Sequence, residues 1–242
     1  MIIKSLPQIL SISFFTLGLA GCTTTTLDDR HLPASQPKRI IIQQQATTAP
    51  SAKYWLKQPP ADYIVWLNQD NNQQRVARYE QFLKDNKVDG VVPMYQLLRS
   101  ARDWQKCNST PYAVPSAELW SNSLATIKIL KFMVDSNVLR DFEVTSVYRD
   151  YSLNICAGGA PRSKHVYNAA IDFRLGPEGT PSTEDLLIIE DTKIKLCNFW
   201  RDYGQSLNMG LGVYASGQIH IDTQGYRTWG PDLTRNTSIC HF

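Results

Sequence analysis

The sequence predicts an α+β fold, with a small, mainly antiparallel sheet and flanking helices. Three observations predict it. Apolar residues recur at helical spacing in several segments, while other segments, such as 142–147, read as strands. The helical and strand-like segments are mixed along the chain, but they do not follow the regular βαβ alternation that a parallel sheet requires.

Residues 1–21 have the features of a secretory signal. Lys4 precedes an apolar run that is too short to span a bilayer comfortably. The run ends in Leu19-Ala20-Gly21-Cys22, which resembles the lipobox of bacterial lipoproteins and implies cleavage before Cys22 and acylation of its thiol. Such an anchor needs no transmembrane helix. The residue after Cys22 is Thr23, not the Asp associated with inner-membrane retention, so we expect an outer-membrane lipoprotein facing the periplasm. The alternative is an ordinary secretory signal followed by an unrelated cysteine.

The charge of the chain gives no support for a nucleic-acid partner. The whole sequence carries +3, and removing residues 1–21 removes only Lys4, so +3 becomes +2. Residues 22–60 are rich in Thr, Gln, Ala, Pro and Ser, and we interpret them as a flexible tether in which His31 has no role. The remainder is long enough for one sizeable core.

Residues 61–111 are expected to form a helical N-terminal subdomain. Two apolar patterns, separated by Asp89-Gly90, predict a helical hairpin, with Pro93 in the first turn of its second helix. The residues of the two patterns are Val76, Tyr79 and Leu83, then Met94, Leu97, Leu98 and Ala101.

Residues 112–242 are expected to form the main domain. A helix should begin at Pro115-Ser116, and a longer one after Ser182, where Ser182 to Asp185 resembles a capping box. The predicted strands are 142–147, 171–173, 210–214 and 218–223.

Four cysteines remain once Cys22 is assigned to the lipid anchor. An even number in an oxidising compartment predicts two disulfides, and no two of these cysteines have the spacing of a zinc-ligand pair. Three connectivities are possible. We favour Cys107–Cys156, which flank the helix and strand leading to the candidate site, and Cys197–Cys240, which would pin the C-terminal tail to the long helix.

Two residues within SKHVYNAAIDF, His165 and Asp172, suggest a metal site. They lie seven residues apart, so they could meet if His165 ends a turn and Asp172 points inward from the following strand. A catalytic zinc site takes three protein ligands and leaves the fourth position to water. His220 lies in a segment of period two and fits the third position, with His241 in reserve. Structural histidines are common, so spacing alone leaves a purely structural role open.

Three ordered blocks strengthen the hypothesis. SVYRDYSLN, SKHVYNAAID and the final HID resemble the D-alanyl-D-alanine metallopeptidases of the LAS group, whose pattern is SxYR, then SxHxxGxAxD, then a last His. The CAGGAPRSKH run is similar to the lipoprotein branch of this family. The resemblance covers roughly residues 115–230 and implies a LAS-type core in which His165, Asp172 and His220 bind Zn²⁺.

The resemblance also implies substrate-binding roles. Arg149 would act in catalysis by stabilising the negative charge that develops on the substrate carbonyl, or would bind a terminal carboxylate. Ser163 would bind substrate or orient the site. A solvated arginine and a simple turn hydroxyl are the alternatives. The family glycine between His and Asp is Asn168 here, which can adopt the same left-handed conformation.

The sequence departs from the family at the general base. The positions where relatives carry an acid or a histidine are Gly217 and Gln218. Asp222 shares the strand face of His220 and is the candidate base, with an equal alternative as an acceptor that fixes an imidazole tautomer.

The function implied is zinc-dependent hydrolysis of D-amino-acid peptide bonds in peptidoglycan stem peptides, as a carboxypeptidase or an endopeptidase. The alternative is a non-catalytic peptidoglycan-binding lipoprotein that retains the fold.

Overall fold

The computed structural model describes residues 58–241. The expected signal peptide, the lipobox with Cys22, His31 and nearly all of the tether lie outside this range. The helices are α1 (Ala61–Leu67), α2 (Asn72–Asp85), α3 (Met94–Leu97), α4 (Trp120–Asp135), α5 (Tyr151–Cys156) and α6 (Thr183–Tyr203), with 3₁₀ turns at Ala117–Leu119 and Arg235–Thr237. The strands are β1 (Phe142–Ser146), β2 (Ala170–Leu175), β3 (Gly210–Val213), β4 (Gln218–Asp222) and β5 (Arg227–Trp229).

The five strands form one mixed sheet in the order β1-β2-β4-β3-β5. The pairs β1–β2, β2–β4 and β3–β4 are antiparallel, and β5 joins β3 in parallel at the edge. The α+β class and the small sheet with flanking helices are therefore confirmed, with a parallel edge strand added. β5 escaped the sequence analysis because three residues are too short to show a periodic pattern.

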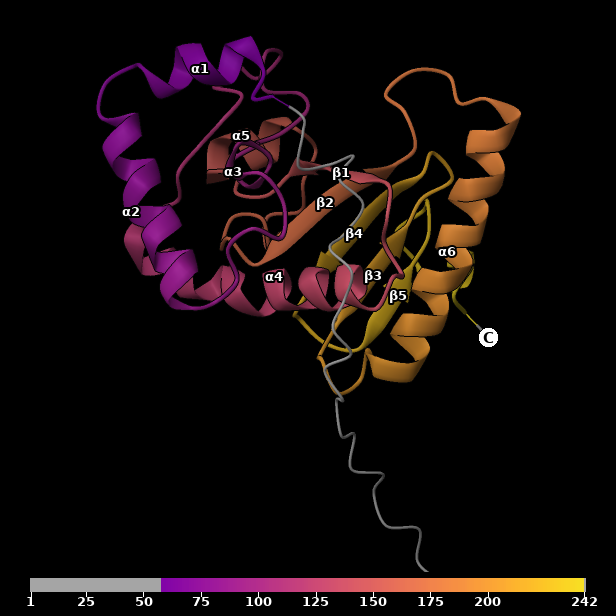
Figure 1. Cartoon of the computed structure of the whole chain (residues 1–242). Coiled ribbons are helices and arrows are strands. Elements are labelled where there is room, and N and C mark those ends of the chain that lie inside the picture. The colour runs from indigo at the N-terminus through magenta and orange to yellow at the C-terminus, as the bar shows by residue number, and fades with distance from the viewer. Residues whose placement is uncertain (1–57, 242) are drawn as a thin grey trace, which may run out of the picture. The chain divides into compact units, whose positions relative to one another are not determined.

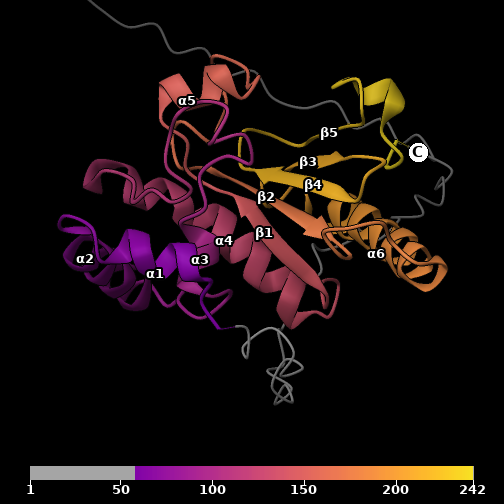
Figure 2. The ribbon, with the colours of Figure 1, turned by 90° about the horizontal axis from the view of Figure 1, so that it is seen from above.

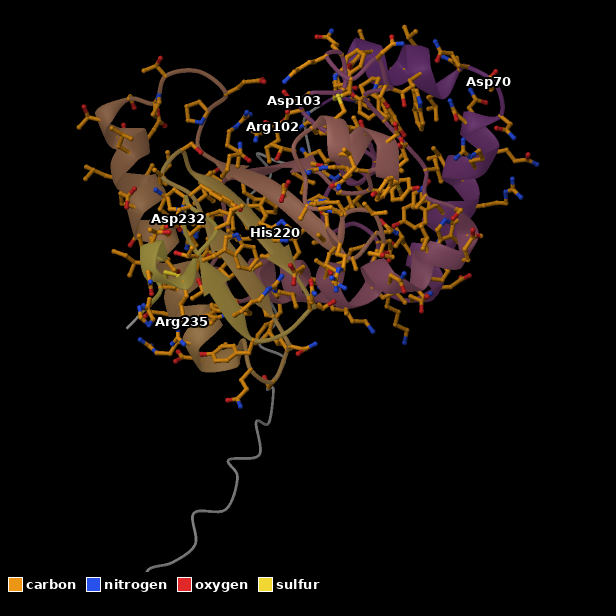
Figure 3. All side chains as sticks on the ribbon, turned by 180° about the vertical axis from the view of Figure 1, so that it is seen from behind. Asp70, Arg102, Asp103, His220, Asp232 and Arg235 are labelled. Carbon is orange, nitrogen blue, oxygen red and sulfur yellow. A yellow bond between two sulfur atoms is a disulfide. The ribbon has the colours of Figure 1, made fainter. Side chains whose placement is uncertain are left out.

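The sheet has one apolar face and one polar face. Along β2, Ile171, Phe173 and Leu175 are buried in the core, while Asp172 and Arg174 alternate with them and point to the other side. Helices α4 and α6 cover the apolar face (Figures 1 and 2). Helices α4 and α6 do not cover the polar face, and His220 of β4 lies on it (Figure 3).

The N-terminal helices differ from the predicted hairpin. Helix α2 buries Val76, Tyr79 and Leu83 as expected, but the second pattern gives only the four-residue α3, and α1 was not predicted. Beyond α3 the backbone pairs with residues 111–113, as the Ala113 N–H donates to the Leu98 carbonyl at 2.8 Å. That pairing takes residues 98–100 out of the helix.

Both predicted subdomains contribute to one hydrophobic core. Tyr79 and Leu83 of α2 belong to the same buried cluster as Leu130 of α4 and Phe173 of β2. The helical segment therefore supports the sheet rather than packing as a separate body.

Two disulfides tie loops to helices. Cys107 is bonded to Cys156 at the end of α5, and Cys197 of α6 is bonded to Cys240, the pairing that the sequence analysis favoured. Within residues 58–241, no helix combines the length and the apolar character that crossing a bilayer requires.

Candidate metal centre

The three predicted ligands meet on the polar face of the sheet. His165 lies in the turns between α5 and β2, Asp172 lies on β2, and His220 is its direct partner on β4. Their candidate ligand atoms all lie within 4.8 Å of one another. His241, the reserve candidate, is exposed and is not part of this group.

A single row of residues crosses the sheet and carries the group. In strand order, the aligned positions are Ser146, Asp172, His220, Gly212 and Trp229. A Cβ atom at Gly212 would lie only 2.6 Å from the Trp229 ring, so glycine is needed for the indole to cover this position. The indole then packs beside the imidazole of His220, with the two ring centroids 5.3 Å apart.

His165 is held as a neutral imidazole with a free lone pair. Its Nδ1–H donates to the Val147 carbonyl at 2.5 Å, which assigns the lone pair to Nε2. Burial lowers the pKa of the ring. Nε2 is buried and lies 3.1 Å from Asp172 Oδ1, yet it makes no hydrogen bond of acceptable geometry. An unpaired buried nitrogen aimed at a carboxylate is the arrangement that a bound cation would satisfy.

His220 presents its other ring nitrogen to the same oxygen. Nε2 donates to Asp222 Oδ2 at 3.0 Å, and Nδ1 lies 2.8 Å from Asp172 Oδ1. Burial lowers the pKa of His220, but the hydrogen bonds to Asp172 and Asp222 outweigh it and raise the pKa to about 9. Burial likewise raises the pKa of Asp172, and the two histidines overcome this effect to hold it well below its usual range.

The donor set fits zinc. Two imidazole nitrogens and one carboxylate oxygen are the ligand types of catalytic zinc sites, and a tetrahedral zinc ion separates its ligand atoms by about 3.3 Å. Asp172 Oδ1 lies 3.1 Å from His165 Nε2 and 2.8 Å from His220 Nδ1, and all candidate ligand atoms lie within 4.8 Å of one another. These distances are close to the separation that zinc requires. We conclude that this His-Asp-His group could hold a metal ion.

Asp222 is fully engaged with its neighbours. Arg227 donates to both of its oxygens, at 2.8 and 2.7 Å, and the Gln224 N–H adds a third bond at 2.9 Å. Its side chain is 2% exposed. Burial raises its pKa, while His220 and Arg227 outweigh burial and lower it far below the usual range. Of the two roles left open for Asp222, this arrangement favours the acceptor that orients His220.

Gly210 of β3 leaves room for the ion pair between Asp222 and Arg227. A Cβ at Gly210 would lie 2.0 Å from the nearer Arg227 nitrogen and 2.6 Å from Asp222 Oδ1. Gly210 and Gly212 are two residues apart and therefore lie on the same face of β3. Two glycines separated by one residue, Gly210 and Gly212, are the sequence signal that could have predicted close side-chain packing at this site.

Arg149 and Ser163 both line the cavity that contains the His-Asp-His group. Arg149 donates through Nη2 to Asp172 and through Nε to the Ser146 hydroxyl at 2.8 Å. Ser163 accepts a long bond of 3.4 Å from the His165 backbone N–H. Arg149 therefore holds the candidate ligand Asp172 in place and also faces the cavity. Ser163 stabilises the turn before His165 and also lines the cavity.

Asn168 occupies the left-handed region, with φ of 54°. The expectation that Asn168 can adopt the left-handed conformation is thus confirmed. Its side-chain amide also donates to the Leu119 carbonyl at 3.2 Å, which attaches the turn after His165 to the start of α4.

The cavity measures about 450 Å³. Tyr214 and Trp229, which the sequence analysis did not single out, also line it, and the Trp229 indole N–H donates to the Tyr214 hydroxyl at 2.9 Å. Burial raises the pKa of Tyr214, so the phenol keeps its proton. Because its oxygen already accepts from Trp229, that proton is available to a ligand.

Comparisons with protein-family models, with curated proteins and with solved structures give no match for this chain.

Proposed function

We propose that this protein is a zinc-dependent peptidase of the D-alanyl-D-alanine metallopeptidase type, acting on D-amino-acid peptide bonds of peptidoglycan stem peptides. The observation that carries the proposal is that His165 Nε2, Asp172 Oδ1 and His220 Nδ1 come together at a cavity. These residues belong to the sequence blocks that resemble the metallopeptidase pattern. Zinc held there would activate a water molecule and polarise the scissile carbonyl.

The chain's own side chains supply the remaining functions. The Nη1 group of Arg149 has no protein partner among the described residues, so its N–H groups are free to bind the substrate carbonyl or a terminal carboxylate. The Tyr214 hydroxyl and Ser163 line the same cavity and can donate to the substrate. Acylation at Cys22 would anchor the domain to the outer membrane on the periplasmic side, within reach of the wall.

One observation favours a second candidate, a non-catalytic peptidoglycan-binding lipoprotein. Among the described residues that line the cavity, the only carboxylates are Asp172 and Asp222. Asp172 is a candidate ligand and Asp222 is bonded to Arg227 and His220, so neither is placed to accept a proton from water.

Metal content and turnover test the two candidates together. The protein should bind about one zinc per chain, and His165→Ala, Asp172→Ala and His220→Ala should each reduce occupancy sharply. His241→Ala is the matched control, since that residue lies outside the group. Turnover is measured on a peptide ending in D-Ala-D-Ala and on purified sacculi, with products identified by mass.

Turnover that disappears with His220→Ala and persists with His241→Ala supports the peptidase. Bound zinc without turnover on any of these substrates supports the binding protein. Full zinc occupancy in the His220→Ala variant contradicts the metal site itself.

A further inference from the structure

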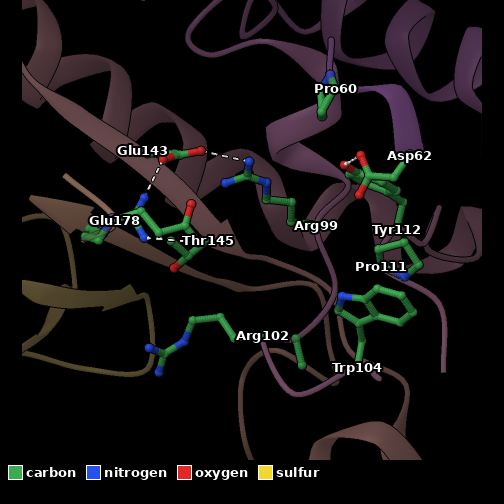
Figure 4. Close-up of a pocket in the computed structure, with 12 residues that line it drawn as sticks. Pro60, Asp62, Arg99, Arg102, Trp104, Pro111, Tyr112, Glu143, Thr145 and Glu178 are labelled. Atoms are coloured by element: carbon green, nitrogen blue, oxygen red, sulfur yellow. Dashed lines mark hydrogen bonds and ion pairs between the residues drawn. The ribbon is translucent and has the colours of Figure 1, made fainter. Parts of the chain in front are cut away.

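A second cavity adjoins the one at the candidate metal centre. It measures about 330 Å³, and Arg99 and Glu143 line one part while Arg102 and Trp104 line another (Figure 4). Arg174, which is bonded to Glu143, also lines it. Arg102 lines both cavities. The border also includes a hydrogen bond of 3.3 Å, in which the Thr145 hydroxyl of the second cavity donates to the Gln218 amide of the first.

The two cavities lie side by side along β2. Asp172 lines the first and Arg174 the second, and these residues are two positions apart on one face of the strand. Two residues of β-strand span about 7 Å. A substrate peptide in extended conformation covers that distance with about two residues.

The basic side chains around the first cavity outnumber the acidic ones. Its lining contains five cations, of which Arg149 and Arg227 are paired with the two carboxylates, Asp172 and Asp222. The other three, Arg102, Arg162 and Lys164, form no ion pair within residues 58–241. The second cavity is lined by three arginines and three carboxylates, the latter being Asp62, Glu143 and Glu178. Arg99 and Arg174 are both bonded to Glu143, at 2.8 and 2.6 Å.

Arg102 is therefore an exposed guanidinium without a carboxylate partner, placed where the two cavities meet. A guanidinium offers paired N–H donors that match the geometry of a carboxylate. Trp104 lines the same cavity, and its half-buried indole offers an apolar surface to the chain that would carry such a group.

We infer that the second cavity is an additional binding subsite for an extended peptide, and that Arg102, at the border between the two cavities, binds a carboxylate carried by the part of the peptide that enters the second cavity. The inference rests on the proposed function for its substrate class. It adds an acidic residue as a specificity determinant. In a substrate that ends in D-Ala-D-Ala only one residue follows the scissile bond, so this acidic residue lies on the acyl side.

Matched peptides test it. One peptide ends in D-Ala-D-Ala and carries Glu two positions before the residue whose carbonyl is cleaved, the second carries Gln there, and the third lacks that position. KM, kcat and equilibrium binding are measured with the zinc-loaded protein. Arg102→Ala should raise KM and the dissociation constant for the Glu peptide by about tenfold, and change those of the other two little.

Two variants complete the design. Trp104→Ala should weaken binding of both long peptides, irrespective of charge, and leave the short one unchanged. Arg235→Ala is the control, because Arg235 is an exposed arginine that lines neither cavity (Figure 3). It should behave as the unmodified protein.

The binding measurement separates this inference from the proposed function. Absence of turnover, with an Arg102-dependent preference for the Glu peptide in binding, contradicts the peptidase and supports the subsite. Equal effects of Arg102→Ala on the Glu and Gln peptides, an effect on the short peptide, no effect at all, or no binding of any peptide overturns the subsite.

Discussion

His165 and His220 face Asp172 through different ring nitrogens, Nε2 in one and Nδ1 in the other. The difference follows from what the opposite nitrogen binds. The Val147 carbonyl accepts from Nδ1 of His165, whereas the Asp222 carboxylate accepts from Nε2 of His220. Each acceptor thus orients its ring so that the other nitrogen, the one that would bind the metal, faces Asp172.

Asp222→Asn should separate the two roles considered for this residue. The amide oxygen can still accept from His220, but the charged pair with Arg227 is lost, so we expect zinc affinity to fall by about 10–100-fold. At saturating zinc, the rate should return close to that of the unmodified protein. Zinc titration and turnover on the same samples measure both quantities.

Asp191→Asn provides the control, because that exposed carboxylate pairs with Lys195 on the surface of α6. A loss of about 10²-fold or more in turnover at full zinc occupancy would instead identify Asp222 as a general base.

At the residue scale, the sequence could predict which side chains come together where their spacing along the chain determines it. His165 and Asp172 could be paired because one turn and one strand bring them together, and the period-two segment around His220 placed it on a strand face. Arg227 could not be recognised as the partner of Asp222. Its strand, β5, pairs with β3, and nothing in the order of the residues reveals that register.

At the scale of elements, local signals predicted the start of α6 and most strands. The Ser182 hydroxyl accepts from the Asp185 N–H at 3.2 Å and the Asp185 side chain accepts from the Ser182 N–H at 2.9 Å, which is the predicted capping box. The length of α3 could not be predicted, because residues 98–100 leave the helix to pair with residues 111–113. That pairing is tertiary and overrides local propensity.

The two disulfides should differ in their effect on the site, although their effect on stability is similar. They close loops with sequence separations of 49 and 43 residues, so the chain-entropy model gives each about 4 kcal/mol. Cys107–Cys156 links the segment that carries Arg102 to the one that leads into Gly158 and Gly159, and these residues line the cavity at the metal centre. Cys197–Cys240 fastens the C-terminal tail to α6.

Replacing both members of one disulfide by serine tests this. Either double variant should lower the free energy of unfolding by ~2–4 kcal/mol in denaturant titrations. Only Cys107→Ser with Cys156→Ser should speed hydrogen exchange in residues 101–107 and 157–163. Equal protection of these segments in the two double variants would show that the disulfide does not brace the cavity.

For the whole molecule, the candidate centre connects distant parts of the chain. His165 comes from a turn, while Asp172 and His220 are 48 residues apart and come from neighbouring strands. Zinc bound by all three would favour the native state over the unfolded chain, and its binding free energy would add to stability. We therefore expect thermal unfolding to report on the metal.

The zinc-dependent rise in the melting temperature should increase with pH. The pKa of His220, raised from 6.5 to about 9 by Asp172 and Asp222, places a proton on the nitrogen that zinc requires. Zinc must displace this proton, so its affinity should rise about tenfold per pH unit up to about pH 9. A raised pKa also stabilises the metal-free fold below pH 6.5, and this contribution is lost as the pH rises through about 9.

These are two descriptions of one linkage, because the proton that stabilises the metal-free fold is the proton that zinc displaces. The difference in stability between the zinc-loaded and the metal-free protein therefore widens as the pH rises. Melting temperatures measured at pH 6.5, 7.5 and 8.5, at fixed free zinc and with a chelator, provide the test. His241→Ala should reproduce the widening, and His220→Ala should show almost no zinc-dependent rise at any pH. A difference that stays constant or narrows as the pH rises would mean that the His220 proton does not compete with zinc, and so that His220 does not bind the metal through Nδ1.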